Sequence, residues 1–215
     1  MDVLCDSSSL IALAETCNVE ALEHLTQRTK AHFLITAGVR DEIIARPLNI
    51  RQYAFSAVRL RNMVERGVLE VVDADAAKTE GIMADANGAY AVGGRTATIL
   101  HRGEAECLAC AKGALLIDEK TCRLLVENPE KLRSSMEAEY RQSVKVDKAR
   151  IAAFREKTKG TAIIRSSELL AIAHRKGFFF GFGERADEAF HAALYALRQS
   201  GCSISGHELE DYQKI

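Results

Sequence analysis

The sequence predicts an α/β fold in which a central parallel sheet is flanked by helices in three layers, with an extra helical region at the C-terminus. Two observations carry this prediction. In the first 118 residues, short apolar runs typical of strands alternate with segments whose apolar residues recur at helical spacing. After residue 118 the pattern is almost entirely helical. Strands that alternate with helices pair in parallel, because each helix returns the chain to the start of the next strand.

The first half of the chain contains three of the expected strands, each a short apolar run: residues 2–6, 32–36 ("HFLIT") and 69–74 ("LEVVDA"). Between them, the apolar spacing predicts helices over residues 7–14, 19–28, 37–45 and 50–67. The third of these helices stops before Pro47, because the residue preceding a proline disfavours the α conformation. The fourth ends at Gly67, a residue type common at helix C-termini.

The second half contains the last strand expected in the core. Residues 75–102 favour a helix followed by a loose loop, residues 102–113 a short helix, and residues 114–118 ("ALLID") a fully apolar strand. One further short strand is expected near residues 143–146. We therefore divide the chain into an α/β core at 1–128, a basic helical insertion at 129–160, and helices at 161–215 that complete the core or pack on it.

Composition and charge narrow the function classes. The formal net charge of −1 excludes a globally basic nucleic-acid binder, and the few aromatics and two prolines are typical of a soluble, helix-rich protein. No apolar stretch reaches the length of a membrane span, and the N-terminus has no basic n-region, so we expect a cytoplasmic protein with no membrane partner. The six cysteines lie singly in apolar segments, and the pair Cys107 and Cys110 has no second pair at zinc-site spacing. We expect small buried side chains rather than disulfides.

Acidic residues occur where the expected strands end and the expected helices begin. Asp6 and Asp118 end two strands, Glu42 follows the strand 32–36 by one or two turns, and Glu104 and Glu106 begin the helix before the last strand. Because the carboxyl ends of parallel strands share one edge of a sheet, these carboxylates are expected to converge there. Crowded carboxylates require protons or a cation. Oxygen ligands without His or Cys suit Mg²⁺ or Mn²⁺, which can activate water and neutralise a phosphodiester during hydrolysis.

Each acid taken alone also has an ordinary structural explanation. Asp6 could cap the first helix, and Asp118 could cap the helix that follows it. Glu104 lies in a first helical turn, where the helix dipole favours acids, and Glu42 alone is a solvated helix residue. Only the joint pattern favours a metal site.

The order and spacing of several motifs resemble the PIN domain family. The motifs are "VLCDSSSLIALAE", "GVRDEI", "RGEAECLACAKGALLIDEKTCR", "AIIRSSELLAIAHRKG" and "ALRQSGCSISGHELEDY". They are most similar to the small prokaryotic PIN-like proteins with a G-E-A-E motif, and the resemblance covers residues 1–125 and 161–212. It implies a PIN-like three-layer fold and a ribonuclease site that uses Mg²⁺ or Mn²⁺.

The resemblance assigns a role to each acid. Asp6 matches the first-strand acid, Glu42 the acid of a V-x-x-E helix, and Asp118 the last strand-end acid. The helix-start acid is Glu104 or Glu106, and the spacing to "LACA" favours Glu104. The catalytic set implied is Asp6, Glu42, Glu104 and Asp118, with Glu106 as a further metal ligand. The resemblance also implies an RNA substrate, an antitoxin protein as partner of a toxin, and a homo-oligomer, namely a dimer.

This chain departs from the commoner PIN pattern at Leu116, where that pattern has Thr or Ser two residues before the last acid. The departure leaves Glu119 as a substitute for the last ligand, and Ser7 could supply a hydroxyl near the metal. We interpret Asp6 as a metal ligand and the serines after it as the cap of the first helix.

The segment from Lys131 to Arg165 is basic, with ten Lys or Arg against four acids. A solvated helix face explains it as well as an RNA-binding surface does. If the segment binds RNA phosphates, the contacts are expected from Lys145, Lys148, Arg155, Lys157 and Lys159.

Other proteins with strand-end aspartates fit less well. A phosphotransferase of the haloacid dehalogenase type needs a second Asp two residues after the first, where this chain has Ser8. A response-regulator receiver has its acids early in the chain and its phosphoacceptor after a middle strand. A dinucleotide-binding loop joins a strand to a helix, and "GFFFGFG" at 177–183 does not. The remaining rival is a PIN-like scaffold that binds RNA or a protein partner with little or no catalysis.

Overall fold

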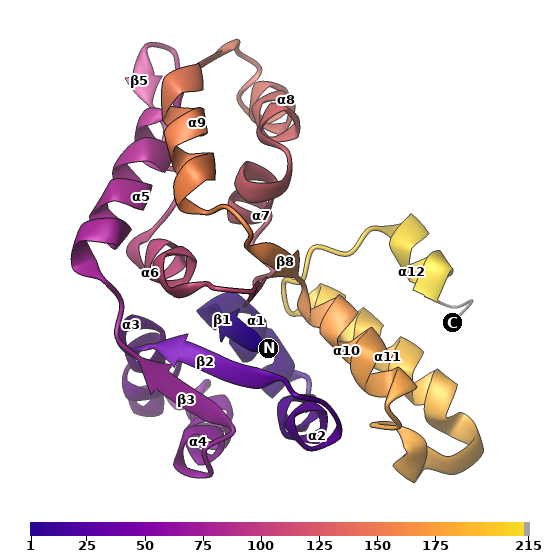
Figure 1. Ribbon diagram of the computed structural model, residues 1–215. Coiled ribbons are helices and arrows are strands. Elements are labelled where there is room, and N and C mark those ends of the chain that lie inside the picture. The colour runs from indigo at the N-terminus through magenta and orange to yellow at the C-terminus, as the bar shows by residue number, and fades with distance from the viewer. Residues whose placement is uncertain (213–215) are drawn as a thin grey trace.

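The computed structural model, which describes residues 1–212, has a central sheet of five parallel strands (Figure 1). The spatial order of the strands is β3-β2-β1-β6-β8. The predicted α/β class with helices on both sides of a parallel sheet is confirmed. The strands are β1 (Asp2–Cys5), β2 (His32–Thr36), β3 (Leu69–Val72), β6 (Ala114–Leu116) and β8 (Ala162–Ile164).

Two sets of helices cover the two faces of the sheet. The chain steps from β1 to β2 to β3 in one direction and from β6 to β8 in the other, and right-handed crossovers then place the connecting helices on opposite faces. Figure 1 shows α2 and α4 on one side and α5, α6, α7 and α9 on the other. The first set is α1 (Ser7–Glu15), α2 (Glu20–Arg28), α3 (Ala37–Arg40), the π-helical turn η1 (Asp41–Ala45), the 3₁₀ turn η2 (Pro47–Asn49) and α4 (Ala54–Glu65). The second set is α5 (Ala76–Gly88), α6 (Arg102–Cys110), α7 (Lys120–Glu127), α8 (Pro129–Tyr140) and α9 (Lys148–Lys157).

The two central strands lie side by side at the middle of the core. Leu4 pairs with Leu115, and the backbone N–H of Asp6 donates to the carbonyl of Leu116 at 2.9 Å. A strand covered on both faces has apolar side chains on both. The residues "ALL" of β6 are all buried, and they form such a continuous apolar run. The register therefore places the residues that follow β1 and β6 next to each other at the carboxyl edge of the sheet.

The structure adds strands that the sequence did not predict. Residues 90–96, expected as a loose loop, form β4 (Tyr90–Val92) and β5 (Arg95–Thr96). They join β7 (Val144–Val146), which the sequence did predict, in a small antiparallel sheet. The fifth strand of the main sheet, β8, was also expected to be helical. It has only three residues, and its pairing with β6 determines its conformation.

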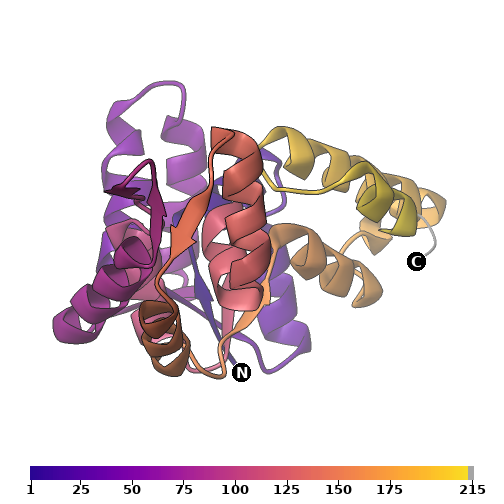
Figure 2. The same ribbon diagram turned by 90° about the horizontal axis from the view of Figure 1, so that it is seen from above.

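The segment 129–160 is held against the core by α9. Helix α9 packs along α5, and Lys157 Nζ bridges to Asp85 at 2.6 Å and to the carbonyl of Gly81 at 3.1 Å. Figures 1 and 2 both show α9 beside α5. The predicted insertion therefore contributes β7 to the small sheet and α9 to the surface of the second helical layer.

The C-terminal helices extend to one side of the sheet as an arm (Figures 1 and 2). Helix α10 contacts α1 and α2 of the first helical layer. The last three residues of the predicted segment 161–215 lie outside the described residues. The arm consists of α10 (Ser166–Arg175), the 3₁₀ segment η3 (Phe180–Arg185), α11 (Ala186–Gln199) and α12 (Gly206–Tyr212).

All six cysteines are free thiols. Cys5, Cys107, Cys122 and Cys202 are buried as expected, whereas Cys17 is exposed and Cys110 is half-buried. No helix among residues 1–212 is both long and apolar enough to cross a membrane.

Candidate functional site

Asp6 ends β1 and is the N-cap of α1. Its backbone is extended (φ −81°, ψ 155°), and its Oδ2 accepts hydrogen bonds from the N–H and the hydroxyl of Ser8 at 3.0 and 2.7 Å. The interpretation that the serines cap this helix was therefore wrong: the carboxylate is the cap, and Ser8 donates to it. Asp6 is 3 % exposed, and burial raises the pKa of its carboxyl, with the charge of Glu42 adding to the rise and the Ser8 bonds opposing it.

Glu104 lies in the first turn of α6, close to Asp6. Its Oε2 accepts the backbone N–H of His101 at 2.6 Å, which fixes the side chain across the start of the helix. Burial raises the pKa of Glu104 to about 8 against the lowering effect of the His101 bond, and the charges of Asp6, Glu119 and Glu42 raise it further. The pKa of Glu104 thus depends on the charges of acids on three other segments.

Glu42 also lies close to the first turn of α6. It lies in η1, which follows the short helix α3 after β2, and α3 contacts α6. A methyl group in place of the Gly103 hydrogen would stand 3.6 Å from Glu42 Oε2, so this carboxylate lies against the first turn of α6. Glu42 is exposed and forms the solvent side of the site.

Glu119 is the fourth acid of the group. It is the N-cap of α7, and its Oε2 accepts the backbone N–H of Cys122 at 2.5 Å. Its charge acts on Glu104. We call Asp6, Glu42, Glu104 and Glu119 the acid cluster. Three of these carboxylates lie at helix N-termini, where the helix dipole favours negative charge and offsets part of their repulsion.

Asp118 lies at the same edge of the sheet, but its carboxylate turns toward β8 and the arm. Its Oδ1 accepts the N–H of Ser166 at 2.8 Å, and its Oδ2 accepts the Ser166 hydroxyl at 2.5 Å. The thiol of Cys202 donates to Oδ1 at 3.3 Å. Asp118 is 3 % exposed, and its two hydrogen bonds with Ser166 attach the first turn of α10 to the end of β6. Its role as a metal ligand stays a prediction.

Glu106, the other candidate in α6, faces away from the acid cluster. It accepts from Thr36 Oγ1 at 3.2 Å, pairs with Arg102 at 3.1 Å, and fills the space in front of Gly38. The structure thus brings Glu104, rather than Glu106, toward Asp6.

The donor chemistry of the acid cluster suits a hard cation. All four side chains offer carboxylate oxygens, the ligand type that Mg²⁺ and Mn²⁺ prefer, and no sulfur or imidazole competes. In their present rotamers, no three His, Cys, Asp or Glu side chains among residues 1–212 form a ready metal site. Asp6, Glu104 and Glu119 each use an oxygen to cap a helix, so binding a cation would require their side chains to close in on it.

The predicted phosphate-binding residues lie in and around β7 and α9. Lys157 is committed to Asp85, and Lys159 comes within 4.0 Å of Glu156. Lys145, Lys148 and Arg155 are exposed and form no ion pair within the described chain. Three of the five predicted cations therefore remain available to a ligand.

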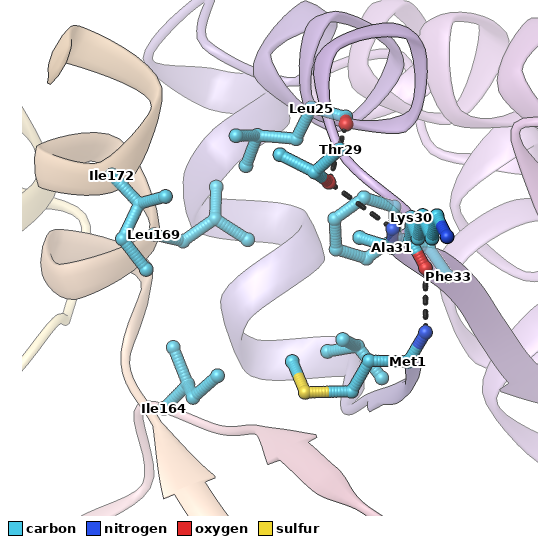
Figure 3. Close-up of a pocket in the computed structure, with 10 residues that line it drawn as sticks. Met1, Leu25, Thr29, Lys30, Ala31, Phe33, Ile164, Leu169 and Ile172 are labelled. Carbon is cyan, nitrogen blue, oxygen red and sulfur yellow. Dashed lines mark hydrogen bonds between the residues drawn. The ribbon is translucent and has the colours of Figure 1, made fainter. Parts of the chain in front are cut away.

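An apolar cavity of about 230 Å³ lies away from the acid cluster (Figure 3). It lies between α2 and α10 beside the amino ends of β1 and β2, where Met1, Phe33, Ile164 and Leu169 surround it. None of its lining residues carries a carboxylate. The acid cluster, at the other end of the strands, is therefore the better candidate for chemistry.

Comparison with known proteins finds no family model, no curated protein and no solved structure that matches this chain. The similarity to PIN domains rests on the motifs quoted above.

Proposed function

We propose that this protein is a metal-dependent endoribonuclease that hydrolyses RNA phosphodiester bonds at the acid cluster. The observation that carries the proposal is the gathering of four carboxylates from four distant segments at the carboxyl edge of one sheet. Such crowding costs free energy unless protons or a cation offset it. A bound Mg²⁺ or Mn²⁺ would supply a Lewis acid for the phosphate and lower the pKa of a water molecule.

The residues of the acid cluster divide the work by burial. Asp6 and Glu104 are buried, and one oxygen of each accepts the Ser8 or the His101 bond, so they would form the inner side of a cation site once their side chains close in on the ion. Glu42, on the solvent side, orients the attacking water by accepting its hydrogen bond. Glu119, rather than Asp118, would supply a further ligand oxygen.

RNA cleavage with and without metal tests this function. We expect cleavage of a single-stranded RNA in Mg²⁺ or Mn²⁺ and none in a chelator. Asp6→Asn and Glu104→Gln should each lower the rate by at least about 100-fold. Glu106→Gln is the matched comparison, two residues away on the same helix. Cleavage that survives both Asp6→Asn and Glu104→Gln would contradict the proposal.

The second candidate is a scaffold that binds RNA or a protein and does not cleave. It is favoured by one observation, that the described side chains form no ready metal site. RNA binding without metal-dependent cleavage would support it.

We extend the proposal to a cytoplasmic toxin that acts as a homodimer and is neutralised by an antitoxin protein. This extension rests on the motif resemblance. Expression of the wild-type protein should arrest growth, and Asp6→Asn should relieve the arrest at equal protein level.

A further inference from the structure

Exposed apolar side chains gather on one segment near the acid cluster. Ten large apolar side chains are exposed among residues 1–212, and four of them fall within residues 50–58, which comprise the turn after η2 and the start of α4. They are Ile50, Tyr53, Phe55 and Val58, and Phe55, at 72 % exposure, is the most exposed of the ten. An exposed apolar patch of this kind marks a surface that another molecule covers.

The charge of the same segment points to an anion. Residues 43–64 contain four arginines and no acid. Arg59 and Arg61 pair with Glu20 and Glu65. Arg46 and Arg51 are exposed, and neither forms an ion pair within residues 1–212. These two guanidinium groups are therefore available to a ligand beside the exposed rings.

The patch continues directly from the acid cluster. Arg46 follows Glu42 by about one helical turn at the end of η1. Tyr53 shares a hollow of about 340 Å³ with Ile43, the residue after Glu42, and with Pro47. Helix α4 also contacts η1 itself.

We propose that Arg46, Arg51, Tyr53 and Phe55 form a stacking face that holds single-stranded RNA next to the acid cluster. Exposed aromatic rings stack on bases of any sequence, and neighbouring cations neutralise the backbone. A site built from carboxylates repels phosphate, so a strand entering it needs cations close by. Arg46 and Arg51 supply them, and the rings fix the bases on either side of the bond to be cut. This inference rests on the proposed ribonuclease function.

The charge of the face argues against a second copy of this chain as its occupant. In a two-fold dimer the same patch meets itself, so Arg46 and Arg51 would meet their own counterparts. Like charges placed opposite each other disfavour such a contact. A polyanion with planar bases satisfies both the rings and the arginines.

RNA binding by matched variants tests the stacking face. All variants are made in an Asp6→Asn background, which allows RNA to bind in Mg²⁺ without being cleaved. Fluorescence anisotropy then measures the affinity for a fluorescein-labelled oligouridine of twelve nucleotides at several salt concentrations. Phe55→Ala should weaken binding about tenfold. Arg46→Gln and Arg51→Gln should each reduce the salt slope by about 0.7. Phe182→Ala removes another exposed ring, 62 % exposed, from the arm and should leave the affinity unchanged.

Three outcomes would overturn the stacking face: equal affinity of Phe55→Ala and its parent, an equal loss with Phe182→Ala, or conversion of a dimer to a monomer by Phe55→Ala without loss of RNA affinity. Failure of the nuclease proposal is recognised separately. Hydrolysis of bis(4-nitrophenyl) phosphate in Mn²⁺ needs the acid cluster and no strand, so the wild-type protein should show it and Asp6→Asn should lose it. Loss of RNA affinity in Phe55→Ala would still support the face if that hydrolysis were absent from every variant.

Discussion

Glu104 links the acid cluster to the stability of the fold. Burial raises the pKa of its carboxyl to about 8, from an ordinary value of 4.5 in the unfolded chain. Between these two values the folded protein binds the proton more tightly than the unfolded chain does. The free energy of unfolding should therefore fall as the pH rises from about 4.5 to about 8 in the absence of metal.

Glu104→Gln keeps an oxygen that can accept the His101 N–H and removes the titration. In a chelator at pH 8.5, this variant should be more stable than the wild type by about 2 kcal/mol, and near pH 4.5 the difference should vanish. Urea unfolding at the two pH values measures it. Glu106→Gln, two residues away on the same helix and hydrogen-bonded to Thr36, is the control. A wild-type protein whose stability does not fall over this range would contradict the role of Glu104.

Asp118 is predicted to be structural where Glu119 is functional. Asp118→Ala leaves the N–H and hydroxyl of the buried Ser166 without their acceptor, which should destabilise the fold by about 2–4 kcal/mol. Glu119→Gln should leave the metal-free stability nearly unchanged but reduce the rise in melting temperature on adding Mn²⁺. Thermal melts with and without Mn²⁺ separate the two. The opposite pattern would make Asp118 the ligand.

These side chains also show why the site was only partly predictable. The positions of Asp6, Glu42 and Glu104 followed from strand ends and helix starts, because the topology places those positions at one edge. The orientation of Asp118 depends on Ser166, 48 residues further along, and no local pattern contains that contact. Glu119 was noticed only because the residue at 116 departs from the commoner pattern.

Among the elements, α9 and α5 are joined in part by one carboxylate, Asp85. Asp85, whose side chain is 14 % exposed, accepts from Lys157 at 2.6 Å, and Arg150 lies 4.0 Å from it. Asp85→Ala should cost about 1 kcal/mol, and a double-mutant cycle with Lys157→Ala should give a coupling of about 0.5–1 kcal/mol. Denaturant unfolding measures both. Lys148→Ala, on the same helix, should have no effect, and a coupling near zero would contradict the bridge.

The same packing determines which variants can test whether α9 binds RNA. Loss of Lys157 would weaken the fold as well as any phosphate contact, so the informative variants are Lys148 and Arg155. The sequence identified these cations as a dense run along the chain. It could not distinguish the one that pairs with Asp85, because that acid lies 72 residues earlier on α5.

Elements that depend on distant partners were the ones that sequence reasoning missed. β1, β2 and β6 are mostly buried apolar runs, and β3 is a short, largely apolar run at the edge of the sheet. Their pattern alone predicts a strand. β4 and β5 are short, and β4 pairs with β7 about fifty residues later. β8 is three residues long and half exposed, so its pairing with β6 rather than its own composition makes it a strand.

At the scale of the whole molecule, the buried Arg165 joins the C-terminal arm to the core. It follows β8 directly, and its guanidinium contacts Glu168 at 3.0 Å, Glu208 of α12 at 2.8 Å and the carbonyl of Ser203 at 3.1 Å. Although burial acts in the other direction, bonds from Ser205 and the charge of Arg165 lower the pKa of Glu208 to about 2. The contribution of Glu208 to stability is therefore complete above about pH 4.5 and is lost as the pH falls through about 2.

Arg165→Gln should release α12 while the central sheet stays folded. The change leaves Glu168 and Glu208 without their cation, and the free energy of unfolding should fall by about 2–3 kcal/mol, a loss limited by the partial exposure of both acids. Backbone amides of residues 206–212 should exchange with solvent faster. Those of β1 and β6 should remain more protected from exchange than those of α12. Hydrogen exchange at near-neutral pH measures this, and Arg175→Gln, at an exposed position of α10, is the matched control. Unchanged exchange over α12 in Arg165→Gln would mean that Leu209 and Tyr212, packed on the arm, hold that helix without the ion pairs.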